Sequence, residues 1–263
     1  MRFIEIKIFE VNSEYFLLIE KIKLSNRSKI IEQEYCKEVQ TKKDAEYYLT
    51  TILNNKEYRK YRFFINYISN DVIIEVINNS KELKNNYLNE LNTLYPNYQL
   101  EYDVMHGEIK INANNKKKIC ALIKNNVFSE IKNFINLVNK KNIYFGLDVF
   151  LLQSFLNDNN RYFYKKFIVL IQKNYNYYRV YQIYYGKIIN YIVIKDTSTE
   201  FEMIFNNILS CIDNKVDEVI VDVDYKEYLS LTEKLYSVNI ILIDYLDKIN
   251  FIDERKIPYG KKI

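Results

Sequence analysis

Three apolar runs decide the fold: KKFIVLIQK at Lys165–Lys173, YYRVYQIYY at Tyr177–Tyr185 and KIINYIVIK at Lys187–Lys195. Each run is rich in Ile, Val, Tyr and Phe and is short enough for a strand, so the sequence predicts three consecutive β-strands. Thr199 and Glu202 then form a T-x-x-E capping box in front of apolar residues at helical spacing. This pattern predicts that a helix follows the three strands.

The same order of elements opens the chain. The predicted elements there are strands at Arg2–Val11, Tyr15–Leu24 and Lys29–Val39, a helix at Thr41–Asn54 and a strand at Tyr61–Ile68. In the second half, the helix that begins at Thr199 is followed by a strand at Val216–Asp224, a helix at Tyr225–Tyr236 and a strand at Asn239–Tyr245. The unit β-β-β-α-β therefore occurs twice, which indicates a duplicated α/β fold with helices covering mixed sheets.

A segment with its own pattern lies between the two units. Its predicted elements are a helix that begins at Ser80 and ends before Pro96, a hairpin that turns at His106-Gly107, a strand at Lys118–Lys124, a helix at Val127–Lys140, a strand at Ile143–Asp148 and a short helix at Val149–Leu156. The predicted division is a first ribonuclease-H-like lobe at 1–78, an inserted α/β subdomain at 79–147, a second such lobe at 148–248 and a polar tail at 249–263.

Composition limits the function classes. The 263 residues carry a net charge of +4, which is too small to indicate nucleic-acid binding by itself, and the basic cluster Lys116–Lys118 fits a solvated loop. Three separate cysteines and a single histidine, His106, argue against a zinc site. We expect no signal peptide, because Arg2–Val11 alternates in charge, and no membrane-spanning segment, because no run of about 18 apolar residues occurs.

Two ribonuclease-H-like βββαβ lobes in one chain are the skeleton of the actin-like ATPase fold, and the place of the insert resembles the FtsA type of this fold. The stretch Ser80–Phe155 also resembles the middle of PilM type IV pilus assembly proteins and of the cytoplasmic part of type II secretion protein L. The residues that carry this resemblance are Leu83–Leu94, Tyr102-Asp103-Val104, Ile119-Cys120-Ala121-Leu122, Phe128–Val138 and Leu147-Asp148-Val149. The expected fold class is α/β, actin-like, with an inserted small α/β subdomain.

The resemblance breaks down at the nucleotide contacts. Actin-like ATPases hold phosphates with Asp and Gly in the turn between the first two strands of each half. The corresponding turns here, FEVNSE at Phe9–Glu14 and QKNYNY at Gln172–Tyr177, contain neither residue, and the loop after Asp224 lacks the usual Gly pair. We therefore expect no nucleotide cofactor, no metal site, no catalytic residues and no ATPase activity.

The resemblance implies a cytoplasmic scaffold at the inner face of the inner membrane, in a pilus or secretion machine. Its partners would be a short segment of a bitopic membrane protein and the assembly ATPase, with homo-oligomerisation left open. The chain crosses twice between the first lobe and the insert, so we expect the partner groove there, near Tyr67, Asn70, Tyr144 and Asp148. The alternative is that the tyrosines pack inside the protein and Asp148 caps the following helix.

Two other function classes stay open. A ribonuclease-H-like nuclease would need several carboxylates around two metal ions, and Glu5 and Glu10 on the first strand are candidates without a matching set. A nucleic-acid-binding module would use Tyr58–Phe64 (YRKYRFF) and Tyr175–Arg179 (YNYYR), where aromatic and basic residues alternate. With 26 tyrosines in the chain, such clusters also arise by chance.

Overall fold

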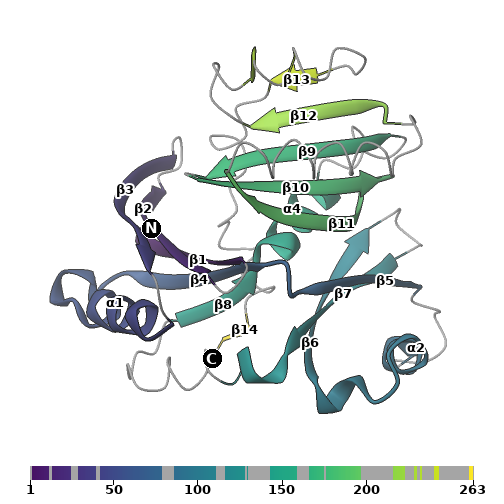
Figure 1. Ribbon diagram of the computed structural model, residues 1–263, viewed down its shortest axis with the longest axis horizontal. Coiled ribbons are helices and arrows are strands. Elements are labelled where there is room, and N and C mark those ends of the chain that lie inside the picture. The colour runs from purple at the N-terminus through teal and green to yellow at the C-terminus, as the bar shows by residue number, and fades with distance from the viewer. Residues whose placement is uncertain are drawn as a thin grey trace.

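The computed structural model describes residues 2–11, 14–24, 29–39, 42–78, 86–110, 116–127, 129, 143–158, 166–174, 176–196, 216–222, 228–229, 232, 240–242 and 261–262. These residues form three β-sheets of six, five and three strands. In Figure 1 the five-stranded sheet stands above the six-stranded one, and the three-stranded sheet lies beside the latter.

The six-stranded sheet contains the amino-terminal unit, in the order β14-β8-β4-β1-β2-β3. Its strands are β1 (Arg2–Val11), β2 (Glu14–Leu24), β3 (Lys29–Val39), β4 (Arg62–Ser69), β8 (Ile143–Leu147) and β14 (Lys261–Lys262). β1, β2 and β3 form an antiparallel meander, and β4 runs parallel to both β1 and β8. The helix α1 (Lys42–Asn54) and the short η1 (Lys56–Tyr58) connect β3 to β4.

The five-stranded sheet repeats this arrangement in the order β13-β12-β9-β10-β11. Its strands are β9 (Phe167–Asn174), β10 (Tyr177–Tyr184), β11 (Lys187–Lys195), β12 (Glu218–Asp222) and β13 (Ile240–Leu242). As in the first sheet, three strands form an antiparallel meander, and the fourth runs parallel to the first and to the fifth. The duplicated unit predicted from the sequence is therefore confirmed in the topology of the two sheets.

The three-stranded sheet is antiparallel, in the order β5-β7-β6. Its strands are β5 (Ile73–Asn78), β6 (Tyr102–Lys110) and β7 (Lys116–Lys124), with α2 (Asn86–Leu94) and the short η2 (Tyr98–Leu100) between β5 and β6. Leu91 of α2 and Tyr98 of η2 are buried against Ile77, Cys120 and Leu122 of the sheet. Burial of this apolar set gives the small sheet its own core.

The predicted hairpin at His106-Gly107 is wrong. β6 continues through both residues, which pair with Cys120 and Ile119 of β7. A single glycine does not end a strand when the alternation of apolar residues continues on both sides. The strands instead end at Lys110 and restart at Lys116, on either side of an asparagine-rich connection.

Sheet pairing joins segments that the predicted division separates. β5, which precedes the limit at residue 78, pairs with β7, and β8, which precedes the limit at 147, pairs with β4. Within the expected tail 249–263, β14 pairs with Tyr144 and Phe145 of β8. The division into 1–78, 79–147, 148–248 and 249–263 remains a proposal.

The helix α4 (Asp148–Asp158) lies at the centre of the molecule and contacts β4, β6, β8 and β11 (Figure 1). It corresponds to the short helix predicted at Val149–Leu156. Its apolar residues Val149, Phe150, Leu152 and Leu156 belong to one core cluster with buried residues from all three sheets. The predicted helix at Thr199–Ile212, and most of those at Val127–Lys140 and Tyr225–Tyr236, lie outside the described residues.

Candidate functional site

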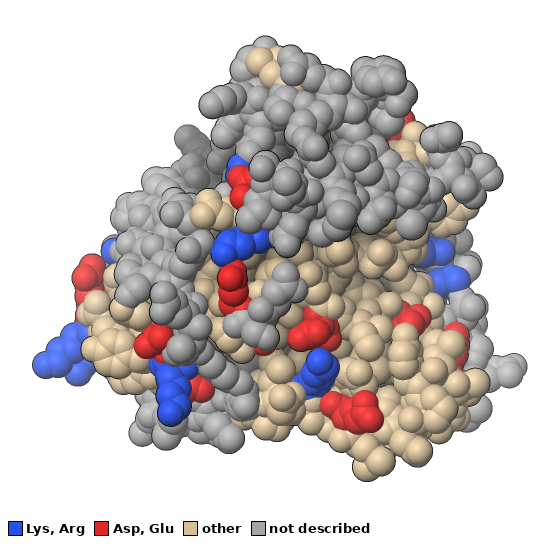
Figure 2. Space-filling model, viewed as in Figure 1, with Lys and Arg blue, Asp and Glu red and all other residues tan. Residues whose placement is uncertain are grey.

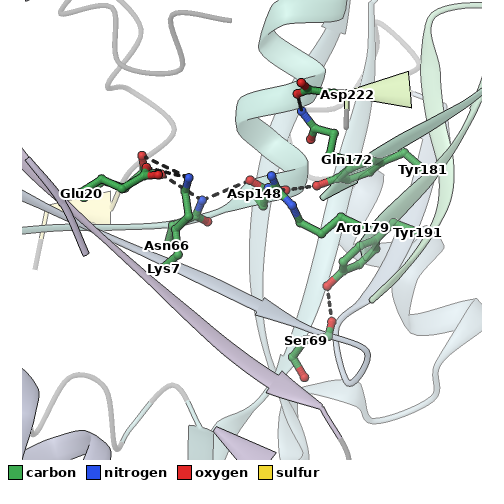
Figure 3. Close-up of polar contacts among 11 residues, drawn as sticks. Lys7, Glu20, Asn66, Ser69, Asp148, Gln172, Arg179, Tyr181, Tyr191 and Asp222 are labelled. Atoms are coloured by element: carbon green, nitrogen blue, oxygen red, sulfur yellow. Dashed lines mark hydrogen bonds and ion pairs between the residues drawn. The ribbon is translucent and has the colours of Figure 1, made fainter. Parts of the chain in front are cut away.

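Charged and polar side chains are buried where the six- and five-stranded sheets face each other. We call Glu5, Lys7, Glu20, Asn66, Asp148, Arg179 and Tyr181 the inter-sheet network (Figure 3). β1 is central in its sheet and buried on both faces. Its even-numbered isoleucines join the main core, so its odd-numbered residues, Glu5 and Lys7 among them, face the other way.

Asp148 is the centre of the network. It is the first residue of α4 and is only 3% exposed. Arg179 of β10 donates from Nη1 to Asp148 Oδ2 at 2.5 Å, and the Tyr181 hydroxyl donates to the same oxygen. Asn66 of β4 donates from Nδ2 to Asp148 Oδ1 at 3.2 Å. One carboxylate therefore ties the start of α4 to a strand of each large sheet.

Lys7 holds the other side of the network. Its Nζ donates to Glu20 Oε2 at 2.8 Å and lies 3.9 Å from Glu5 Oε2. Burial works against the charge of Lys7, but the carboxylates of Glu5 and Glu20 outweigh it and hold the pKa of Lys7 above its usual value. Asn66 also donates to Glu5 at 3.4 Å and so joins the Lys7 group to Asp148.

The two turns that bind phosphate in actin-like ATPases are joined here by aromatic rings. Phe9 of β1 and Tyr177 of β10 stack with ring centroids 5.1 Å apart, and Phe16 lies 5.3 Å from the same tyrosine ring. All three rings are buried. Lys195 of β11 pairs with Glu14 of β2 at 2.6 Å beside them. The phenyl rings of Phe9 and Phe16 offer no hydrogen-bond donor to a phosphate group.

A third set of contacts joins β4 to β11. The Tyr191 hydroxyl donates to the Ser69 carbonyl oxygen. Asn70 donates from Nδ2 to the Val193 carbonyl at 2.8 Å and accepts from the Val193 N–H at 2.6 Å. The Asn70 amide thus pairs with the edge of β11 as a neighbouring strand would.

The predicted groove residues do not form one open surface. Tyr67 is 3% exposed and donates to Glu10 Oε2 at 2.5 Å, and Asp148 is buried in the inter-sheet network. Burial, followed by the charge of Glu10, raises the pKa of Tyr67. Tyr144 is half-buried on β8, while Asn70 is exposed and bound to β11. A groove at these positions remains a prediction, with Tyr144 and Asn70 as its accessible members.

The two stretches proposed for nucleic-acid stacking are largely internal. Tyr61, Phe63 and Phe64 of the first stretch are buried in the six-stranded sheet. In the second stretch Tyr177 and Tyr178 are buried, and Arg179 is the ion-pair partner of Asp148. On the face shown in Figure 2, basic and acidic side chains are interspersed over the described surface.

The acidic residues considered for metal chemistry have other partners. Glu5 lies beside Lys7 and Asn66, and Glu10 accepts hydrogen bonds from Tyr15 and Tyr67. Within the described ranges, no group of three or more His, Cys, Asp or Glu side chains is placed to hold a metal ion. The loop after Asp224, expected to contact adenosine in this fold, lies outside the described residues.

Known structures give the fold. No family model matches the sequence, and no curated protein matches it significantly. A Bacteroides thetaiotaomicron protein with an actin-like ATPase fold and unknown function aligns over 93% of this chain and 92% of its own, with a TM-score of 0.55 and 12% identity. The fold is actin-like.

Two further solved structures come from a pilus biogenesis complex and a secretion system. The PilM–PilN type IV pilus biogenesis complex aligns over 97% of this chain and 94% of its own, with a TM-score of 0.54 and 10% identity. The cytoplasmic domain of EpsL, an inner-membrane component of the Vibrio cholerae type II secretion system, aligns over 84% and 82%, with a TM-score of 0.50 and 6% identity. At these identities the likeness concerns the fold alone.

Proposed function

We propose that this protein is a non-catalytic scaffold in a type IV pilus or type II secretion-like assembly platform. It would bind a short segment of a bitopic inner-membrane protein from the cytoplasmic side, with the assembly ATPase as a second partner. Among the described helices, none has the length and apolar composition to span a bilayer. The proposed association with the membrane is peripheral and includes the bound partner.

The observation that carries the proposal is that side chains of the protein itself fill the junction between the two large sheets. In an actin-like ATPase this junction holds the nucleotide, and nucleotide contacts join the two halves. Here the stacked rings of Phe9 and Tyr177 join them, and Asp148 is bonded both to Asn66 of the first sheet and to Arg179 of the second. Because side chains already hold the two halves together, the protein is preorganised and can bind a peptide without first binding a nucleotide.

The solved structures support the choice of partner. PilM was solved in complex with PilN, and EpsL is an inner-membrane component. An extended peptide could bind by adding a strand or by docking side chains in pockets. Tyr144 would contribute a large contact area with a polar tip.

The test is binding of synthetic peptides that copy the cytoplasmic segments of bitopic membrane proteins encoded beside this gene. We expect one of them to bind the full chain, and Tyr144→Ala to weaken binding by about tenfold or more, as a central tyrosine contact does. Tyr47→Ala on α1, where Tyr47 is 68% exposed, is the matched control and should bind like the unchanged protein.

ATP with Mg²⁺ provides the opposing measurement. Calorimetry should show no micromolar binding, because such affinity requires about 8 kcal/mol of organised contacts. If ATP and Mg²⁺ bind tightly and no peptide binds, the protein is an actin-like nucleotide-binding protein and the scaffold proposal is wrong.

A further inference from the structure

An exposed aromatic surface lies at the turn between β10 and β11. Tyr184, Tyr185 and Ile189 are 44%, 42% and 42% exposed, although most large apolar residues of these strands are buried. The rings of Tyr184 and Tyr185 meet edge to face with centroids 4.3 Å apart, and Phe167 packs edge-on against Tyr184. The two tyrosine rings form one exposed aromatic surface at the turn of the hairpin, and Ile189 is exposed further along β11.

The backbone of this turn is unfavourable for the residue that it carries. Tyr185 has φ 49° and Gly186 has φ 73°, so both central residues are left-handed. Such two-residue turns favour Asn-Gly, because a bulky side chain is strained at positive φ. Strain at a site that asparagine would relieve suggests that the tyrosine ring has a role on the surface.

Two lysines flank the aromatic area. Lys187 follows the turn directly, and Lys117 belongs to the basic cluster noted in the sequence, on β7 of the three-stranded sheet. Burial, followed by the positive charge of Lys117, lowers the pKa of Lys187, so the two ammonium groups are close enough to interact. In the described part of the chain, neither lysine is in an ion pair.

We propose that Tyr184, Tyr185 and Ile189, with Lys187 and Lys117, form a surface that rests on an anionic lipid membrane. Tyrosine is favoured at the level of the lipid headgroups because its ring is apolar and its hydroxyl is polar. Lysines near the membrane are attracted to anionic headgroups. The proposal rests on the proposed function for the presence of the membrane.

The experiment is sedimentation of the full chain with vesicles of equal parts phosphatidylglycerol and phosphatidylcholine, and with vesicles of phosphatidylcholine alone. We expect binding to the anionic vesicles at low salt, weakening as salt screens the lysines. The variant Tyr185→Asn/Lys187→Glu should lose about fivefold or more of its apparent lipid affinity, given the usual contribution of one lysine near an anionic surface. The single variant Tyr185→Asn should also melt at a higher temperature, because asparagine tolerates the left-handed turn.

The matched control is Lys43→Glu/Tyr47→Asn on α1, which removes one exposed tyrosine and reverses one exposed lysine on the opposite side of Figure 1. It should bind vesicles like the unchanged protein. Lack of binding to anionic vesicles by the unchanged protein would overturn the proposal, as would equal loss in both variants. If vesicles do not bind but Tyr185→Asn/Lys187→Glu loses capture of the membrane-protein peptide, the surface takes an acidic protein segment and the lipid assignment is wrong. Because the vesicle assay contains no peptide, its failure leaves the peptide-binding result unaffected.

Discussion

At the scale of single residues, Asp148 decides how the two large sheets are held together. Replacing it with alanine leaves the Arg179 charge buried without its carboxylate. Removing one member of a buried ion pair typically costs about 3–5 kcal/mol, so Asp148→Ala should lower the free energy of unfolding by that amount. Urea unfolding followed by circular dichroism measures the change.

The variant Tyr181→Phe is the control for Asp148→Ala. It removes one hydrogen bond to Asp148 but keeps the ion pair with Arg179, so it should cost only about 1 kcal/mol. If Asp148→Ala is no more destabilising than Tyr181→Phe, the ion pair does not stabilise the junction.

The sequence indicated only part of this site. Asp148 and Asn70 were named because they lie beside chain crossings, and both do make contacts between sheets. The sequence suggested that Arg179 is a basic side chain on the surface, beside tyrosines that could stack on bases. Sequence alone does not show that both faces of β10 are covered. Lys7 was not singled out, since a charge that alternates with isoleucines normally faces solvent. Its burial follows from the second sheet, which only tertiary structure reveals.

At the scale of elements, the edge of β11 depends on Asn70. The Val193 N–H points away from β10 and is bound by the Asn70 side chain. In Asn70→Ala we therefore expect fast hydrogen exchange at Val193 and a loss of about 1–2 kcal/mol in stability for the two hydrogen bonds. Exchange measured by NMR at single residues tests this.

The variant Asn70→Asp gives the comparison for that experiment. It lacks the donor to the Val193 carbonyl but keeps an acceptor for the Val193 N–H, so protection of this amide should largely remain. Unchanged exchange at Val193 in Asn70→Ala would show that another group protects the edge of β11.

Elements were easier to predict than their partners. Strand periodicity predicted the six strands of the two meanders, because apolar alternation and short turns depend only on residues that are close in sequence. Sheet membership of β5 and β8 was not visible, since each is a short apolar strand whose neighbour comes from elsewhere in the chain. The turn predicted at His106-Gly107 was wrong because pairing with β7 keeps these two residues in a strand, although the local sequence favours a turn.

At the scale of the whole molecule, buried tyrosine hydroxyls and the buried Lys7 ammonium group should make the stability of the fold fall at alkaline pH. Burial raises the pKa of Tyr67 and Tyr191 above the usual 10.0, and the pKa of Lys7 is also raised. The folded protein then holds more protons than the unfolded chain once the pH passes the unfolded pKa values. Stability should therefore be full below about pH 10 and fall as the pH rises further.

Thermal unfolding between about pH 8 and pH 11 measures this fall, in the range where unfolded tyrosines titrate. The double variant Tyr67→Phe/Tyr191→Phe lacks the two hydroxyls and should show a shallower decline, although it starts from a lower stability at neutral pH. An equally steep decline in the variant would assign the alkaline sensitivity to other groups.

The hydrogen bonds between the end of β4 and β11 also determine how the molecule responds to a pulling force. Ser69 and Asn70 are neighbours in sequence, and together they hold Tyr191 and Val193 through three hydrogen bonds. A force that pulls the two halves apart loads these bonds together, so they must break in one step instead of one after another. If the protein is the scaffold proposed above, these contacts would transmit load between its two halves without any change of bound ligand.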